Sequence, residues 1–274
     1  MRKWKLTDYI PLMILLLIVL TSMLAPVLAP YDPMEMNMTI RMQPPSREHI
    51  LGTDSIGRDV FSRILYGGRE SILLAAAATA LSMLLGTLIG MTAGYFGGAA
   101  DFVITTVSNI FQGLPGMTMM IAIAGILGPG TGHMLLCLVI TSWVSFSRLV
   151  RGEVMRVKQE EYIEGVRSFG TGHLRILFFH ILPNIAGNLI VVFTTRVGRT
   201  VLNVAGLTNL GLGIQPPAPD WGVMINDAKK YFRSCPHLLL APGICIILLS
   251  LSVNLLGDVI RDKMDVKNDH FREY

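Results

Sequence analysis

Long apolar runs separated by shorter polar segments dominate the pattern along this chain. Six runs are each long enough to cross a bilayer, for which a helix needs about 20 apolar residues. They cover residues 10–28, 71–95, 102–127, 133–150, 183–207 and 238–260. Because lipid offers no hydrogen bonds to a bare backbone, each run is expected to be helical. The pattern therefore predicts an all-α membrane protein with six transmembrane helices.

Two of the runs carry local signals of their own. The third is interrupted by Gly113-Leu-Pro-Gly116, and Pro115 predicts a kink there because proline removes one helical hydrogen bond. The first follows Arg2, Lys3 and Lys5, and it ends in Pro-Val-Leu-Ala-Pro, which is not a convincing cleavage site. We expect this first run to be an uncleaved anchor helix with its amino end in the cytoplasm.

The orientation follows from charge and from the even number of spans. Basic residues gather after the fourth run and in the C-terminal tail, so the positive-inside rule places both segments, and both termini, in the cytoplasm. The even count places the segment between the first two runs outside, although it holds Arg41, Arg47, Arg58, Arg63 and Arg69. We predict an anchor helix and external loop in residues 1–70. A transmembrane domain would follow in residues 71–274, with a cytoplasmic loop at about 151–182.

Composition agrees with a membrane protein and excludes several other classes. Of the 274 residues, 51% are hydrophobic and 15% are charged, whereas soluble domains carry roughly 25% charged residues. A net charge of +4 is too small and too scattered to indicate nucleic-acid binding. The three cysteines have neither disulfide nor zinc-finger spacing, and we expect no metal site. No acid, base or nucleophile constellation is present, so the chain is not expected to be an enzyme.

Residues 160–184 form a charged segment between the fourth and fifth runs. Helical spacing places Tyr162, Val166 and Phe169 on one stripe, and a charged stripe holds Glu160, Glu164 and Arg167. Gly170 is expected to end this helix, and a second short helix, 174–181, would lead to Leu182-Pro183. Such a pair of cytoplasmic helices beside a membrane helix can act as a lever. The alternative is an ordinary solvated loop.

The fifth run contains charged residues in an otherwise apolar stretch. Arg196, Arg199 and Asn203 are three and four residues apart, so they share one helical face. An arginine within a membrane helix is a functional candidate, because it must face protein or water. We expect these residues to line a translocation path. Alternatively, the arginines pair with acids of a partner subunit, or Arg199 lies near the outer surface.

The charged segment also carries a family resemblance. Glu164-Gly-Val-Arg-Ser-Phe-Gly170, then nine residues, then His180-Ile-Leu-Pro183, resembles the "EAA" motif of ABC importer permeases. In that family the order is Glu-Ala-Ala, three residues, Gly, nine residues and Ile-x-Leu-Pro. The glutamate, the glycine and the Leu-Pro keep their offsets, while Gly165, Val166 and His180 depart from the pattern. The resemblance implies a type I importer fold and an ATPase-coupling role for Glu164, Arg167, Gly170, Leu182 and Pro183.

Three further stretches are similar to the second permease of dipeptide, oligopeptide and nickel importers. They are residues 51–72, 209–231 and 254–265, and the middle stretch holds the outer-loop candidates Asp220, Trp221 and Asp227. The resemblance implies a homologous second permease, two cytoplasmic ATPases that bind ATP and magnesium, and an extracytoplasmic binding protein. It also implies a multi-pass protein of the bacterial or archaeal plasma membrane, with a midplane path near Pro115.

The cargo is divided between two branches of that family. The residues 221–228 and the charged fifth run favour nickel or a metal chelate, and dipeptides or oligopeptides are the alternative. Residues 52–59 echo a phosphate-binding loop, but Arg58 and Asp59 stand where lysine and a hydroxyl are needed. A transporter driven by an ion gradient is the alternative from another class. It requires an ionisable group inside the membrane, whereas Asp101 and Asp258 lie near the ends of runs.

Overall fold

The computed structural model describes residues 6–269, and every regular element in that range is a helix. Three short segments interrupt or extend the helices: η1 (Met38–Ile40), the π-helical η2 (Ile176–Ile181) and η3 (Lys229–Tyr231). The α-helices are α1 (Leu6–Met23), α2 (Ala25–Leu28), α3 (Val60–Phe96), α4 (Gly98–Gly113), α5 (Gly116–Leu127), α6 (Thr131–Val157), α7 (Glu161–Ser168), α8 (His173–Arg175), α9 (Leu182–Asn209), α10 (Trp221–Ala228) and α11 (His237–Asp269).

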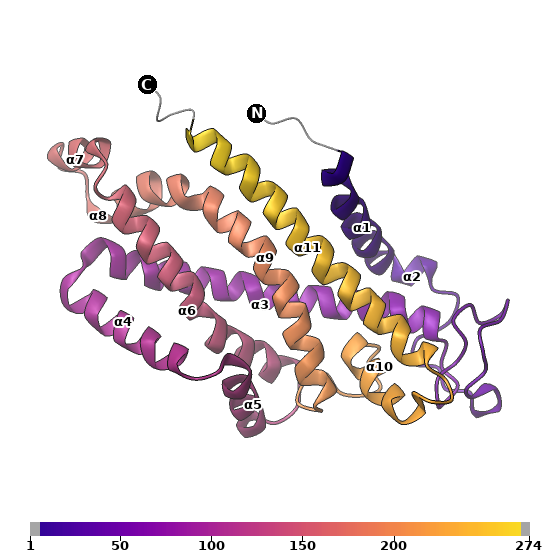
Figure 1. Ribbon diagram of the computed structural model, residues 1–274. Helices are drawn as coiled ribbons and strands as arrows, with labels where there is room; N and C mark the ends of the chain where they lie inside the picture. Colours follow the sequence, from indigo (N-terminus) through magenta and orange to yellow (C-terminus); the bar gives the residue numbers. More distant parts are fainter. Residues whose placement is uncertain (1–5, 270–274) are drawn as a thin grey trace.

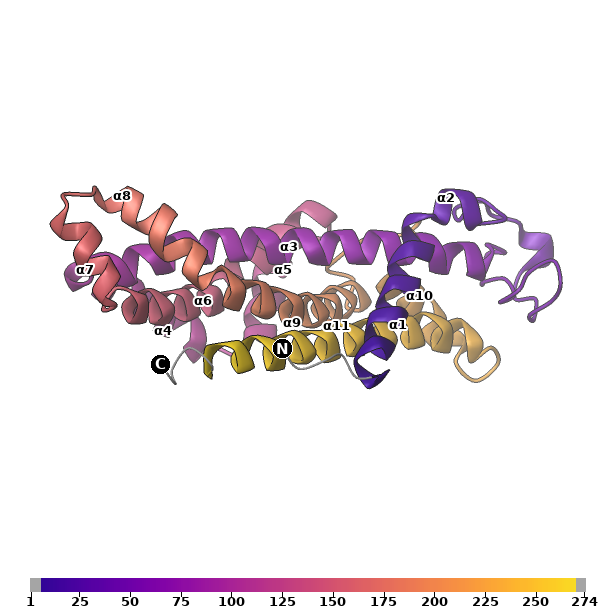
Figure 2. The same ribbon diagram turned by 90° about the horizontal axis from the view of Figure 1, so that it is seen from above.

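The helices form an elongated bundle with different segments at its two ends. Figure 1 shows α7 and the end of α11 on the same side of the bundle, whereas α10 and the segment after α2 lie at the other end. In Figure 2, α3 runs along the bundle from the region of α7 and α8 to that of α2. The helix α3 packs most extensively on α6, and α9 packs on both α3 and α11.

Four continuous helices are long and apolar enough to cross a membrane: α3, α6, residues 173–209, and α11. The pair α4 and α5 passes the same test together but is bent by 91°, and would make a fifth span if it crosses as one. The apolar helix Asp8–Met23 at the start of the chain is shorter. By length and composition the described chain thus offers four or five spans, compared with the six that the sequence predicts.

The break between α4 and α5 lies where the sequence predicts a kink. Leu114 and Pro115 have ψ angles of 141° and 122°, so the backbone leaves the helix for two residues. A proline disfavours the helical conformation of the residue before it. The result is a sharp turn of the chain at Pro115 and two separate helices.

Three glycines allow α3 and α6 to approach closely. A Cβ atom on Gly86 would lie 2.6 Å from the Trp143 carbonyl oxygen, and one on Gly94 would lie 2.8 Å from that of Arg151. Gly90, between them, would bring its Cβ within 2.8 Å of the Val150 Cβ. Small residues at four-residue spacing let two membrane helices come into backbone contact. This stripe fixes α3 against α6.

The second short helix predicted before the fifth span is not separate from it. Residues 173–209 are one continuous helical stretch. A proline inside a helix clashes with the carbonyl four residues earlier, which usually interrupts the helix. Here η2 precedes Pro183, and the Leu182 N–H donates to the Leu177 oxygen, five residues back. This wider turn keeps the chain helical across the proline.

Candidate functional site

The helix α7 is held against the bundle by one buried residue and one polar contact. Ile163 is fully buried in a core cluster with Tyr95, Val154 and Ile181, which come from α3, α6 and η2. The apolar stripe expected from the sequence packs only in part, because Val166 lies against this cluster while Phe169 is 91% exposed. The short helix has its own core contact, which the spacing of the larger residues did not indicate.

Tyr162 makes the polar contact. Its hydroxyl accepts a hydrogen bond of 3.1 Å from the Asn184 side chain in the first turn of α9. Partial burial raises the pKa of the Tyr162 phenol above its ordinary value. The phenol is therefore neutral at physiological pH, and α7 is fixed to α9 as well as to the core.

Tyr95, near the end of α3, ties this region together. Its hydroxyl lies 2.8 Å from Nδ1 of His173 in α8, and Lys158 Nζ donates to its backbone oxygen at 2.6 Å. The Lys158 ammonium and the Arg167 guanidinium lie 5.5 Å and 6.0 Å from the centre of its ring. Cations within about 6 Å of an aromatic face are attracted to it. Sequence reasoning missed Tyr95, which has no local signal at the end of an apolar run.

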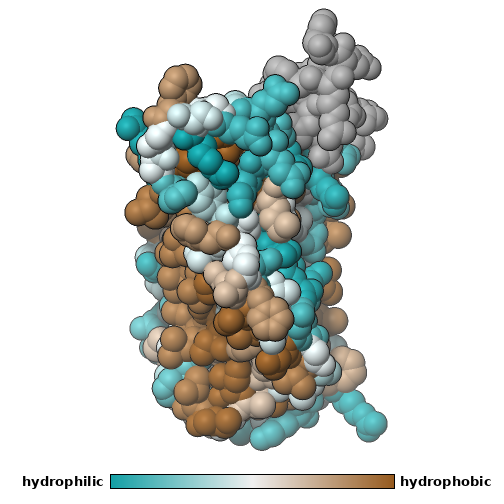
Figure 3. Space-filling view, turned by 90° about the vertical axis from the view of Figure 1, so that its left-hand side faces the viewer, coloured by the Kyte–Doolittle hydropathy of each residue, from teal (hydrophilic) through white to brown (hydrophobic). Residues whose placement is uncertain are grey.

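The other side of this region is open. Glu164, Arg167 and Gly170 are all exposed, and so is Pro183, while Leu182 is half-buried at the start of α9. Gly170 has a φ of +75°, in the left-handed region that favours glycine. Figure 3 shows hydrophilic residues gathered at the level of α7, above a hydrophobic lower part at the level of α4 and α5. The predicted coupling residues thus border one exposed, polar end of the bundle.

A hollow of about 260 Å³ lies between α3, α5, α6 and α9. It brings together the three fifth-run candidates, and it includes two residues that follow the break at Pro115, although Pro115 itself does not line it. The lining residues are Thr79, Gly116, Met117, Met120, Thr141, Ser142, Ser145, Phe146, Arg196, Arg199, Thr200 and Asn203.

The charge of this hollow is of one sign only. Arg196 is half-buried about midway along α9, and Arg199 is exposed one turn further on. The lining holds no carboxylate, and neither arginine forms an ion pair with another residue whose side chain the structure describes, 8–263. Two positive charges lie on neighbouring turns, and no carboxylate in the lining offsets them. The hollow therefore attracts anions. Both arginines line this hollow, and their place in a translocation path stays a prediction.

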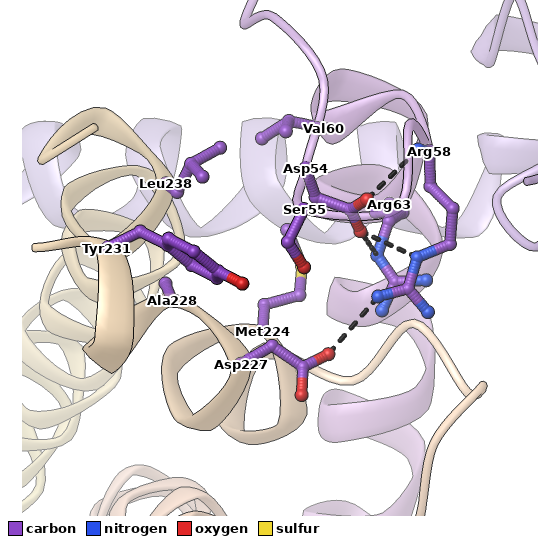
Figure 4. Close-up of a pocket in the computed structure, with 10 residues that line it drawn as sticks. All are labelled: Asp54, Ser55, Arg58, Val60, Arg63, Met224, Asp227, Ala228, Tyr231 and Leu238. Atoms are coloured by element: carbon purple, nitrogen blue, oxygen red, sulfur yellow. Dashed lines mark hydrogen bonds and ion pairs between the residues drawn. The ribbon is translucent and has the colours of Figure 1, made fainter. Parts of the chain in front are cut away.

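Buried ion pairs organise the opposite end of the bundle. Arg58 donates to Asp54 at 2.6 Å and to Asp227 of α10 at 3.1 Å, and Arg63 lies 3.7 Å from the same Asp54 carboxylate. Figure 4 shows Arg58 between the two acids, at the edge of a small pocket that Tyr231 also lines. Residues that are far apart in the sequence thus join the segment after α2 to α10.

Asp220 and Trp221 have structural positions. Asp220 is fully buried, caps α10 through the Gly222 N–H at 2.8 Å, and accepts a hydrogen bond of 2.6 Å from Ser71. Burial raises the pKa of Asp220, although these hydrogen bonds oppose the shift. The Trp221 indole donates to the Ile64 oxygen at 2.9 Å. Asp227, the third outer-loop candidate, borders two pockets beside Arg58.

Family comparisons match most of the chain. The model of the family described as "Binding-protein-dependent transport system inner membrane component" matches residues 86–266. A second model, described as the "N-terminal TM domain of oligopeptide transport permease C", matches residues 10–45. The two matches therefore include the polar end at α7, α10 and every lining residue of the hollow except Thr79.

Individual relatives match over almost the full length. The glutathione transport system permease protein GsiD of Pectobacterium atrosepticum is 40% identical, covering 92% of this chain and 84% of that protein. The dipeptide transport system permease protein DppC of Alkalihalophilus pseudofirmus is 39% identical, covering 93% and 84%. A solved inward-facing MetNI methionine ABC transporter superposes with a TM-score of 0.59, covering 72% of this chain and 94% of that chain. At 15% sequence identity, this last likeness shows the fold alone.

Proposed function

This chain belongs to the binding-protein-dependent transport system inner membrane components, as a permease of the dipeptide and oligopeptide ABC importers, and we propose that it carries small peptides. Supporting this cargo are matches, over more than nine-tenths of the chain, to permeases named for dipeptides and glutathione. The sequence analysis favours nickel or a metal chelate as the cargo, whereas these relatives favour the alternative, a peptide. The ion-gradient alternative finds no support among them.

The family also defines the kind of assembly. Its relatives are transport permease subunits of the inner membrane, which fits a multi-pass chain without enzymatic activity of its own. Importers of this family work with ATPase and substrate-binding partners. In detail, the proposed complex contains a homologous second permease, two cytoplasmic ATPases and an extracytoplasmic binding protein in a bacterial or archaeal membrane. The ATPases would hold ATP and magnesium.

The exposed end at α7 is the proposed docking surface for the ATPase. Glu164, Arg167 and Gly170 would face that subunit, because they are exposed while Ile163 of the same helix is buried. A push on α7 would reach α3 through Tyr95, and it would reach α6 and α9 through the core around Ile163. Movement of these packed helices as units provides the two discrete states that alternating access requires.

The hollow between α3, α5, α6 and α9 is the proposed part of the translocation path. It lies beside the break at Pro115, and its polar lining distinguishes it from the apolar exterior of the surrounding helices. At the other end of the bundle, the Arg58–Asp227 pair would hold the segment after α2 on α10. That end would face the binding protein.

Uptake by cells tests the proposed cargo. Cells that produce the complete importer are compared with cells that lack only this chain, and each is given a labelled dipeptide or labelled nickel. We expect dipeptide accumulation to be lost without this chain, and nickel accumulation to be unchanged. Loss of nickel uptake with unchanged dipeptide uptake would contradict peptide transport.

A further inference from the structure

We infer that Arg196 and Arg199 make the permease selective for peptides with a net negative charge. This inference rests on the proposed function and specifies the cargo of the same pathway. Both guanidinium groups line the hollow of about 260 Å³, and no carboxylate lines it with them. A cation within a membrane helix is unfavourable without a counter-ion or water. A cargo that brings its own carboxylates supplies that counter-ion.

The number of charges distinguishes peptide classes. An ordinary dipeptide has one carboxylate and one ammonium group, so it leaves one of the two guanidinium groups without a counter-ion. A dipeptide with an acidic side chain has two carboxylates and can satisfy both Arg196 and Arg199. Because these residues are three apart on α9, their side chains lie on one face and can bind two groups of a single small molecule.

The remaining lining suits the neutral and cationic parts of such a peptide. Thr141 donates its hydroxyl proton to the Cys137 oxygen of its own helix at 2.9 Å, and Thr200 donates to the Arg196 oxygen at 2.9 Å while its hydroxyl lies 3.0 Å from that of Thr79. The hydroxyl oxygens therefore keep lone pairs that accept hydrogen bonds from peptide N–H or ammonium groups. These acceptors are uncharged, so the lining offers charge compensation to carboxylates but none to an ammonium group.

The test compares two dipeptides that differ in one functional group, Ala-Glu and Ala-Gln. The complete complex is reconstituted in vesicles, and its binding protein is saturated with each labelled peptide in turn. The permease variant is Arg196→Gln/Arg199→Gln, which removes both charges and keeps polar side chains. We expect Ala-Glu uptake to fall about tenfold relative to Ala-Gln uptake, because Coulomb attraction is strong at an effective dielectric near 20.

Two further variants separate charge from side-chain shape. Arg196→Lys/Arg199→Lys keeps both charges and is expected to retain the preference for Ala-Glu. Arg199→Glu places an acid at the exposed position, and is expected to shift the preference from Ala-Glu to Ala-Lys. The matched control, Arg41→Gln/Arg47→Gln, removes two exposed charges from the segment after α2. It should leave the ratio of Ala-Glu to Ala-Gln uptake unchanged.

Each outcome decides for or against the inference. An equal change for both peptides in the Gln variant would overturn charge selection. Failure of the Gln variant to assemble, together with normal assembly of the Lys variant, would show that the arginines pair with acids of the partner permease. That result would also overturn the inference that these arginines select the cargo by its charge. If the wild-type complex imports nickel but neither peptide, the proposed function itself fails and the inference fails with it.

Discussion

Gly170 shows how one backbone angle can decide coupling. Its φ of +75° costs an ordinary L residue about 1–2 kcal/mol. No atom lies within 4 Å of the place where its Cβ would be, so backbone strain and not collision determines the effect of a substitution. We expect Gly170→Val to displace the turn after α7 and reduce ATP-driven uptake. Gly170→Asn should retain most of the uptake, because asparagine tolerates this region. Uptake per assembled complex measures both, and equal values for the two variants would contradict the prediction.

At this scale the sequence predicts residue types better than it predicts their partners. Asp54 contacts both nearby arginines, Arg58 at 2.6 Å and Arg63 at 3.7 Å. Asp59, the neighbour of Arg58 in the sequence, instead contacts His49 at 2.9 Å and caps α3. The Arg58–Asp227 pair joins residues that are far apart along the chain. Only the folded helices bring these side chains together, so no local pattern reveals the pair.

Among the elements, the contact between α3 and α6 is the most sensitive to side-chain size. We expect Gly90→Val to destabilise the subunit by about 1–3 kcal/mol, because the added atoms would overlap α6 at a packed contact. Gly125→Val is the matched control, since no atom lies within 4 Å of a Cβ at that position in α5. Thermal unfolding of the purified subunit in detergent measures both variants. Equal midpoints for the two would show that the helices do not need this close approach.

Helix boundaries show what an apolar pattern can and cannot predict. The apolar run starts at residue 71, but α3 begins at Val60, because Asp59 caps its first turn through the Ser62 N–H at 2.7 Å. Residues 60–70 include the polar Ser62, Arg63, Arg69 and Glu70, yet many residues of this segment are buried against the segment after α2 and α10. A hydropathy pattern detects burial in lipid. It misses a helix extension that is buried by protein.

For the whole molecule, the ribbon separates the segment after α2 from α7, and labelling can test on which side of the membrane each lies. Met38 in η1 is 57% exposed, and Gln159 between α6 and α7 is also exposed. Each is replaced by cysteine in turn. In intact cells we expect a membrane-impermeant maleimide to label Met38→Cys and not Gln159→Cys. The background replaces the native thiols of Cys137, Cys235 and Cys245. The reverse labelling would show that the arginine-rich first segment is cytoplasmic.

The number of spans is the part of the architecture that the sequence leaves least defined. Run length alone counts residues 10–28 and residues 102–127 as one span each. In the structure the first of these is divided between α1 and α2, and the second is bent by 91°. Proline residues lie near both breaks, at Pro26 and Pro115. A hydropathy count does not register such bends, because it treats every apolar segment as straight.

ATP-driven peptide accumulation in vesicles tests peptide import by an ABC permease most directly. The vesicles contain the complete complex with ATP inside and the peptide-loaded binding protein outside, and ionophores collapse all ion gradients. We predict that labelled Ala-Glu accumulates only when ATP is present. The Glu164→Lys complex should hydrolyse ATP without accumulating peptide, because the reversed charge lies on the exposed face of α7 that is proposed to meet the ATPase. Accumulation that follows an imposed ion gradient without ATP, or transport of nickel and no peptide, would contradict this function.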